Sequence, residues 1–151
     1  MSACCRRTAL AALATTLIAL AATGCGSGIS LDEPIEGPSW RLVQLGDQPI
    51  APGNEPQRDA QIQFDAASGR VSGSGGCNRV SGTYQRTGYA LRMSQLASTR
   101  MACADPQRSA DETQFFAALQ TTASYRFQGP ARLTLLDAGG RMVAMLDALV
   151  R

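Results

Sequence analysis

The stretch from Gly73 to Tyr84 constrains this chain more than any other. It reads GSGGCNRVSGTY, so glycine recurs where a backbone turns tightly, adopts a positive φ or lies close to another segment. A glycine-rich loop can also bind phosphate, but that motif needs a following helix and usually a lysine. Here a strand-like composition follows, and the chain has no lysine. The stretch therefore predicts a bulge or tight turn in a sheet.

Two cysteines lie beyond the N-terminal region, Cys77 in this stretch and Cys103 in the segment STRMAC. An even pair in an exported domain usually forms a disulfide, which here would stabilise the fold by roughly 3 kcal/mol. The alternative is a thiolate nucleophile at Cys77, for which Arg79 or Arg100 would have to supply a field that lowers the thiol pKa.

The N-terminal residues have the pattern of an export signal. Arg6 and Arg7 precede an alanine- and leucine-rich run over 8–22, which is too short for a convincing membrane span. The run ends in Ala-Thr-Gly before Cys25, which resembles the lipobox of bacterial lipoproteins. We therefore expect a signal peptide over 1–24, lipidation of Cys25 and a flexible tether over 25–38. The alternative is an ordinary secretory signal, with Cys25 as a free or paired thiol.

Lipidation of Cys25 would anchor the protein to a membrane, because several acyl chains bind stably where one does not. Gly26 follows the cysteine, so the aspartate signal for inner-membrane retention is missing. By resemblance to lipoprotein sorting, we expect a location at the outer membrane, facing the periplasm.

Charge and composition exclude several classes of function. Of the 14 basic residues, all arginine, two precede Cys25, so the mature chain would carry 12 against 12 acids. A neutral chain without a basic stripe does not favour nucleic-acid binding. The chain contains no histidine, which excludes histidine-based catalytic triads and histidine metal sites. Two cysteines are too few for a closed zinc site, so we expect no metal, no cofactor and no catalytic residue.

The hydrophobic pattern predicts many short strands and one helix. Alternating or β-rich segments predict strands near 39–45, 60–65, 70–73, 82–86, 89–93, 125–127, 132–136 and 141–146. Ser109 and Glu112 form a capping-box pattern, followed by apolar residues at helical spacing that predict a helix over 109–123 and a core position for Phe115. We expect an α+β domain: mainly an antiparallel sheet or partly open barrel with one packed helix.

These motifs, in this order, resemble the META domain family of HslJ-like bacterial lipoproteins (DUF306) over 39–151. The resemblance rests on Trp40-Arg41-Leu42, Gly69 to Gly73, the Gly-Gly-Cys-Asn-Arg segment, Thr99 to Cys103 and the helix carrying Glu112. Besides the two cysteines, it implies signature positions at Gly75, Gly76, Asn78, Arg79, Gly82, Tyr84, Thr99, Arg100 and Met101. It brings no agreed catalytic or binding role for any of them.

The resemblance implies a non-enzymatic envelope protein linked to stress, heat shock and resistance to novobiocin-type antibiotics. We expect a monomer that binds an envelope protein or a small ligand. Two alternatives remain: a thiol-dependent redox protein or enzyme using Cys77 and Cys103, and a β-barrel that binds a small ligand in an apolar cavity.

Overall fold

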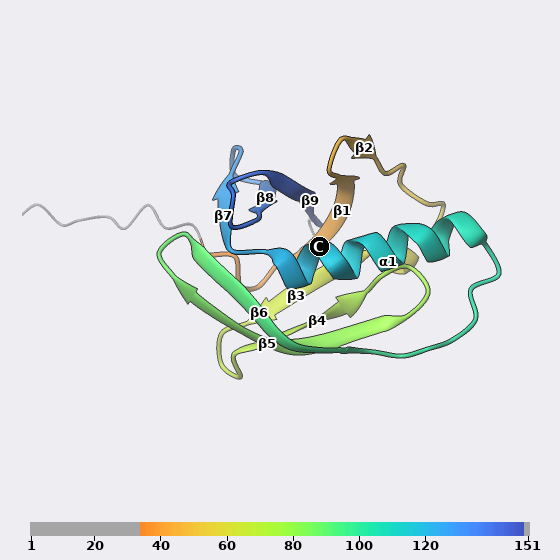
Figure 1. Cartoon of the computed structure of the whole chain (residues 1–151), viewed down its shortest axis with the longest axis horizontal. Coiled ribbons are helices and arrows are strands. Elements are labelled where there is room, and N and C mark those ends of the chain that lie inside the picture. Colours follow the sequence, from red (N-terminus) through yellow and green to blue (C-terminus); the bar gives the residue numbers. More distant parts are fainter. Residues whose placement is uncertain (1–33, 150–151) are drawn as a thin grey trace, which may run out of the picture. The chain divides into compact units, whose positions relative to one another are not determined.

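The computed structural model describes residues 34–149 (Figure 1). These residues form strands, one α-helix and a short 3-10 helix, in the order β1 (Ser39–Leu45), β2 (Gln48–Pro49), η1 (Pro56–Arg58), β3 (Gln61–Asp65), β4 (Arg70–Ser74), β5 (Arg79–Thr87), β6 (Ala90–Ser98), α1 (Pro106–Thr121), β7 (Ser124–Phe127), β8 (Arg132–Leu136) and β9 (Met142–Leu149). The expected signal peptide over 1–24 and the lipidation site Cys25 lie outside the described residues.

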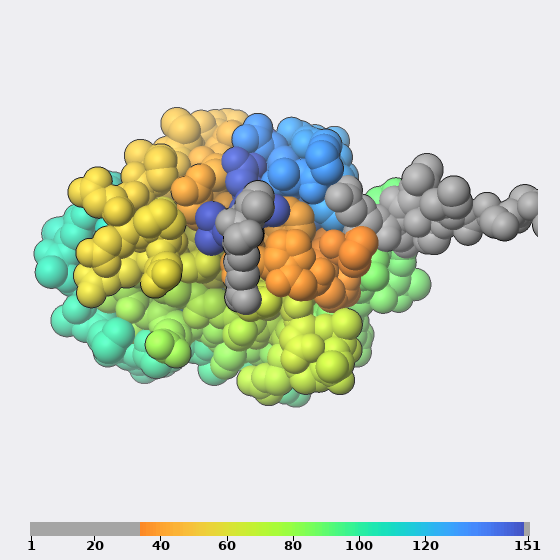
Figure 2. All heavy atoms as spheres, turned by 180° about the vertical axis from the view of Figure 1, so that it is seen from behind, coloured from red at the N-terminus to blue at the C-terminus, as the bar shows by residue number. Residues whose placement is uncertain are grey.

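The strands form one sheet whose two ends meet. Every pairing between the named strands is antiparallel, in the order β2-β1-β3-β4-β5-β6-β7-β8-β9, and β1 also pairs with β9. Seen from behind, the dark blue residues of β9 lie beside the orange residues of β1 (Figure 2). The sheet is thus ring-like, which confirms the expected antiparallel α+β fold with one helix.

The helix lies near the point where the strand pairing of this ring is shortest. Strands β6 and β7 share one register pair, Ala90 with Ser124, and α1 packs against β1, β6, β8 and β9. Figure 1 shows α1 crossing between the group β3 to β6 and the group of β1, β2 and β7 to β9. Within residues 34–149, no helix has the length and apolar character to cross a membrane.

The core follows from strand alternation, since successive side chains point to opposite faces of a sheet. On β3, Ile62 and Phe64 are buried while their neighbours face outward. The helix adds Phe115 and Leu119 to the same cluster. The largest fully buried side chains are Trp40, Tyr125, Phe64, Phe115, Ile35, Ile62, Leu91, Leu119, Leu133, Leu135, Leu146 and Val71.

The helix begins and ends earlier than the capping-box pattern predicted. Asp105 is the N-cap, and its carboxylate accepts a hydrogen bond from the backbone N–H of Gln107 at 2.9 Å, with a proline at the first helical position. An aspartate cap followed by proline is a stronger start signal than Ser109, which lies inside the helix. Glu112 is therefore free to serve another purpose than capping.

The folded part also begins earlier than expected, since the predicted tether over 25–38 includes packed residues. Ile35 is fully buried, and its carbonyl accepts a hydrogen bond from the indole N–H of Trp40 at 2.7 Å. Glu36 accepts a hydrogen bond from Tyr84 at 3.0 Å and pairs with Arg86 at 3.2 Å. The composition of this segment did not indicate that it packs against the domain, because Tyr84 and Arg86 lie far away in the sequence.

This N-terminal contact makes a titration prediction at Tyr84. Burial first, then the hydrogen bond and charge of Glu36, raise the pKa of Tyr84 to about 12. Because this pKa is higher in the folded state, the stability it contributes is complete below the usual tyrosine value and is lost as pH rises towards 12. Absorbance of tyrosinate should show one late step that Tyr84→Phe removes and Glu36→Gln shifts to lower pH. Tyr89→Phe, at an exposed position, should leave that step in place.

Candidate functional site

The glycine-rich stretch forms a tight turn between β4 and β5 and a bulge further along. In the turn, the N–H of Gly75 donates to the carbonyl of Asn78 at 2.8 Å, and the N–H of Gly76 donates to the Ser74 hydroxyl at 3.0 Å. Gly76 has φ of +107°, a conformation that L side chains rarely adopt. At Gly82 the register between β5 and β6 shifts. The sequence prediction of a turn and bulge is thus confirmed.

Glu112 reaches from α1 into this turn. Its carboxylate accepts hydrogen bonds from the backbone N–H of Cys77 at 3.0 Å, the backbone N–H of Asn78 at 2.6 Å and the side-chain amide of Asn78 at 2.7 Å. The residue is 6% exposed. A Cβ at Gly75 would lie 2.7 Å from a Glu112 carboxylate oxygen, so glycine at 75 makes room for the carboxylate. Buried charge is stable where hydrogen bonds satisfy it.

Asn78 lies at the centre of a hydrogen-bonded cluster that also includes Glu112, Thr99 and Met101. Its side-chain oxygen accepts hydrogen bonds from the Thr99 hydroxyl at 2.8 Å and the Met101 N–H at 2.7 Å. Its amide nitrogen donates to Glu112 and to the Met101 carbonyl at 3.3 Å. The Thr99 hydroxyl in turn accepts from the Arg79 N–H at 3.1 Å. This uses both donors and both acceptors of the amide, so Asn78 locks the turn to the segment after β6.

The two cysteines close the same cluster. The structure places Cys77 and Cys103 at disulfide-bonding distance, with Cα atoms 5.9 Å apart and a sequence separation of 26, as the predicted pairing requires. Both are half-buried. A Glu112 carboxylate oxygen and the two sulfurs lie within 4.8 Å of one another. Disulfide-bonded sulfurs are not thiolate ligands, so in this form the three residues do not make a metal site.

The remaining signature positions do not all belong to this cluster. Tyr84 lies at the Glu36 contact, and Gly82 lies at the bulge, where a Cβ would come within 2.7 Å of the Ser94 carbonyl. The side chains of Arg79, Arg100 and Met101 are exposed. The structure therefore gathers the two cysteines, Asn78 and Thr99 into one framework and leaves the arginines on the surface.

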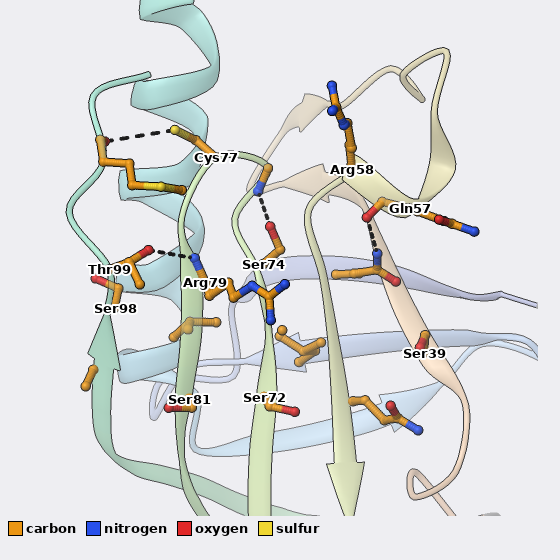
Figure 3. Close-up of a pocket in the computed structure, with 18 of the residues that line it drawn as sticks. Ser39, Gln57, Arg58, Ser72, Ser74, Cys77, Arg79, Ser81, Ser98 and Thr99 are labelled. Carbon is orange, nitrogen blue, oxygen red and sulfur yellow. Dashed lines mark hydrogen bonds between the residues drawn. The ribbon is translucent and has the colours of Figure 1, made fainter. Parts of the chain in front are cut away.

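A polar groove lies beside the turn. It has a volume of about 950 Å³ and is bounded by β3, β4, β5, the end of β6, η1 and the start of α1. Figure 3 shows Arg79 in the middle, with Gln57 and Arg58 on one side and Ser98 and Thr99 on the other. Its lining combines hydroxyl, amide and guanidinium groups with the apolar residues Ile62, Val80, Ala97 and Met101. This mixed lining differs from the mainly apolar cavity that a small-ligand barrel needs.

Sequence reasoning missed two features of this region. The capping-box pattern predicts a role for Glu112 at the helix start, whereas its carboxylate binds residues 34 and 35 positions away in the sequence. The groove was not predicted at all. The available signal was serine at every second position of β4, Ser72 and Ser74, together with Ser81 on β5.

Comparisons with known proteins identify the family and similar folds. The family model described as META domain matches residues 33–148, which include α1 and all but the last residue of β9. A search of curated proteins gave no match. Three solved structures, described next, are similar to most of this chain.

A protein from Burkholderia xenovorans, solved by NMR, is 25% identical, with 78% of this chain and 85% of that chain covered and a TM-score of 0.60. A second NMR structure is 26% identical, covers 75% and 90% of the two chains and has a TM-score of 0.58. A crystal structure of a DUF4847 family protein from Bacteroides vulgatus shares the fold at 17% identity, with 77% and 95% covered and a TM-score of 0.54.

Proposed function

This chain belongs to the META domain family, and from that premise we propose that it is a non-enzymatic lipoprotein of the cell envelope that acts by binding. In this proposal Cys25 carries the lipid anchor, the domain faces the periplasm from the outer membrane, and binding of an envelope component supports stress tolerance and resistance to novobiocin-type antibiotics.

One observation carries the proposal: the polar side chains of Asn78 and Glu112 are fully engaged in hydrogen bonds within the protein. A reaction centre needs a group free to take a proton or attack a substrate. Here the Asn78 side-chain amide makes four hydrogen bonds with oxygen and nitrogen partners and one contact with the Cys103 sulfur. The Glu112 carboxylate accepts three hydrogen bonds, two of them from backbone N–H groups. These residues hold a turn in place, which favours a scaffold with a binding surface over a catalytic centre.

The proposal is tested in a deletion strain complemented with plasmid copies. We expect deletion to raise novobiocin sensitivity and envelope permeability at elevated temperature. The intact gene should restore both, and Cys25→Ala should fail although the protein is still exported, because an unlipidated domain is not held at the membrane. Unchanged permeability and sensitivity in the deletion strain would reject the envelope role. Full rescue by Cys25→Ala would reject the anchor.

A second candidate, a thiol-dependent redox protein, is favoured by the position of Glu112 within 4.8 Å of both sulfurs. A nearby carboxylate can act as a base for a thiol. The two candidates make opposite predictions for a protein without the disulfide.

Replacement of both Cys77 and Cys103 by alanine should lower the free energy of unfolding by about 3 kcal/mol, because the unfolded chain is no longer cross-linked. Denaturant titration measures this loss. If the proposal is right, the variant still complements the deletion strain at every temperature at which the deletion has a phenotype and the variant remains folded. A folded variant that fails to complement, while its amount in the envelope is normal, would favour thiol chemistry instead.

A further inference from the structure

We propose that the polar groove binds an anionic saccharide, meaning a hydroxyl-rich sugar that carries a phosphate or a carboxylate. This inference rests on the proposed function as a binding domain and specifies its ligand class. It concerns the sheet face opposite the core, where no signature residue other than Arg79 and Thr99 contributes a polar side chain.

Strand register builds the floor of the groove from a row of polar or small residues. Ser39 on β1 pairs with Gln63 on β3, which pairs with Ser72 on β4, and this row continues through Ser81 on β5 to Ala97 on β6. Adjacent strands lie about 4.8 Å apart, so the row presents its side chains next to one another across five strands. The floor is low over β4, β5 and β6, where the row carries only serine and alanine.

A second row raises the end of the groove and brings the charge. Gln61 pairs with Ser74, and Ser74 pairs with Arg79, two positions along from the first row and therefore on the same face. Figure 3 shows Arg79 extending over the strands, with Ser74 on one side and Ser72 and Ser81 on the other. A guanidinium is thus placed over a floor of hydroxyl groups.

The charge of the lining is one-sided. Arg58, Arg79 and Arg108 line the groove, and no aspartate or glutamate does. Arg58 is paired with Glu55 at 3.0 Å on an exposed surface, and Arg108 donates to the Gly76 carbonyl at 3.4 Å. Arg79 takes part in no ion pair among the described residues. A guanidinium presents a planar fork that suits phosphate or carboxylate oxygens, so Arg79 is the anchor for an anion.

The hydroxyl and amide groups select the rest of the ligand. Serine hydroxyls donate and accept hydrogen bonds, and glutamine side chains add further donors and acceptors, which complements the many hydroxyls of a sugar. No aromatic ring lines the groove, so a neutral sugar lacks a stacking platform and the anion must supply the anchor. A peptide would need apolar pockets for alternate side chains, whereas the middle of the floor presents the hydroxyl groups of Ser72 and Ser81.

Calorimetry and backbone-amide NMR on the full-length protein test the inference with four probes: glucose 6-phosphate, glucuronate, glucose and inorganic phosphate. We expect glucose 6-phosphate and glucuronate to bind and to shift the amide signals of Ser72, Ser81 and Arg79. Glucose should not bind, because it lacks the anionic group that Arg79 recognises. Inorganic phosphate should bind at least tenfold more weakly than glucose 6-phosphate, because it lacks the sugar hydroxyls.

Variants separate the anchor from the floor. Arg79→Ala should weaken glucose 6-phosphate binding about tenfold or more, and Ser81→Leu should abolish it by filling the floor while leaving Arg79 in place. Arg126→Ala, an exposed arginine on β7 away from the groove, is the matched control and should bind normally. Equal binding of glucose and glucose 6-phosphate, equal binding of inorganic phosphate, or no effect of Arg79→Ala would each overturn the inference.

Vesicles that contain a phosphorylated glycolipid distinguish the two sources of such a ligand. Binding to these vesicles that glucose 6-phosphate displaces supports a membrane headgroup, and binding of the free sugar alone supports a soluble saccharide. Absence of all saccharide binding, in a protein that still rescues the deletion strain, overturns this inference and leaves the proposed envelope role standing. Saccharide binding by a protein whose deletion has no phenotype supports this inference and rejects the proposed envelope role.

Discussion

Replacement of Glu112 by alanine should lower the free energy of unfolding by about 4 kcal/mol. The change leaves three donors without an acceptor: the backbone N–H groups of Cys77 and Asn78 and the side-chain amide of Asn78. A buried donor that loses its partner costs about 1–3 kcal/mol, and three donors lose theirs here. The expected loss is a large share of the stability of a domain of this size. Denaturant titration of the oxidised protein measures it.

Two further variants make this result specific. Asp111→Ala removes the neighbouring carboxylate, which accepts only an exposed hydrogen bond from Gln107, so the loss should stay below about 0.5 kcal/mol. Glu112→Gln should fall between, at about 2 kcal/mol, because the amide oxygen still accepts from the backbone while its NH2 group faces the amide donor of Asn78. If Glu112→Ala were no more destabilised than Asp111→Ala, the carboxylate would not hold the turn.

Replacement of Gly73 by alanine should also cost about 4 kcal/mol, through overlap rather than lost hydrogen bonding. Gly73 on β4 faces Ile62 on β3. A Cβ at 73 would overlap the backbone carbonyl oxygen of Gln61 and come within 2.8 Å of the Ile62 Cα. Backbone atoms cannot move aside alone, so β3 and β4 must separate and their ladder must distort. Thermal and denaturant unfolding of the variant measure the cost.

Two control substitutions separate the steric overlap at Gly73 from other effects of adding a Cβ. Ser72→Ala changes an exposed residue of the same strand and should alter stability by less than about 0.5 kcal/mol. Gly88→Ala has open space around its Cβ but φ of +56°, so it should cost only the 1–2 kcal/mol of a left-handed conformation. A Gly73→Ala protein as stable as Gly88→Ala would mean that β3 and β4 tolerate wider spacing than the structure implies.

Local pattern was sufficient for most of the strands. Alternation of apolar and polar residues placed β1, β3 and β8 close to their observed bounds, because a strand that is buried on one face records that face in its own sequence. The helix was found but misplaced by three residues at its start, since both Asp105 and Ser109 are good caps. The tether was extended too far, because Ile35 and Glu36 are held by Trp40, Tyr84 and Arg86.

Periodicity and local backbone demands were sufficient to predict the antiparallel class, the single helix and the turn at the glycine-rich stretch. They favoured a disulfide between Cys77 and Cys103 but left a thiolate nucleophile at Cys77 open, and the structure places the two residues at disulfide-bonding distance. Helix packing brings Glu112 to the turn, and strand register places Ser72, Ser81 and Arg79 in one groove. Both outcomes depend on distant segments brought together by strand register and helix packing. A residue's own neighbours in the sequence carry no record of which distant donor it will meet, so the same glutamate is compatible with a helix cap or a buried anchor until the chain is folded.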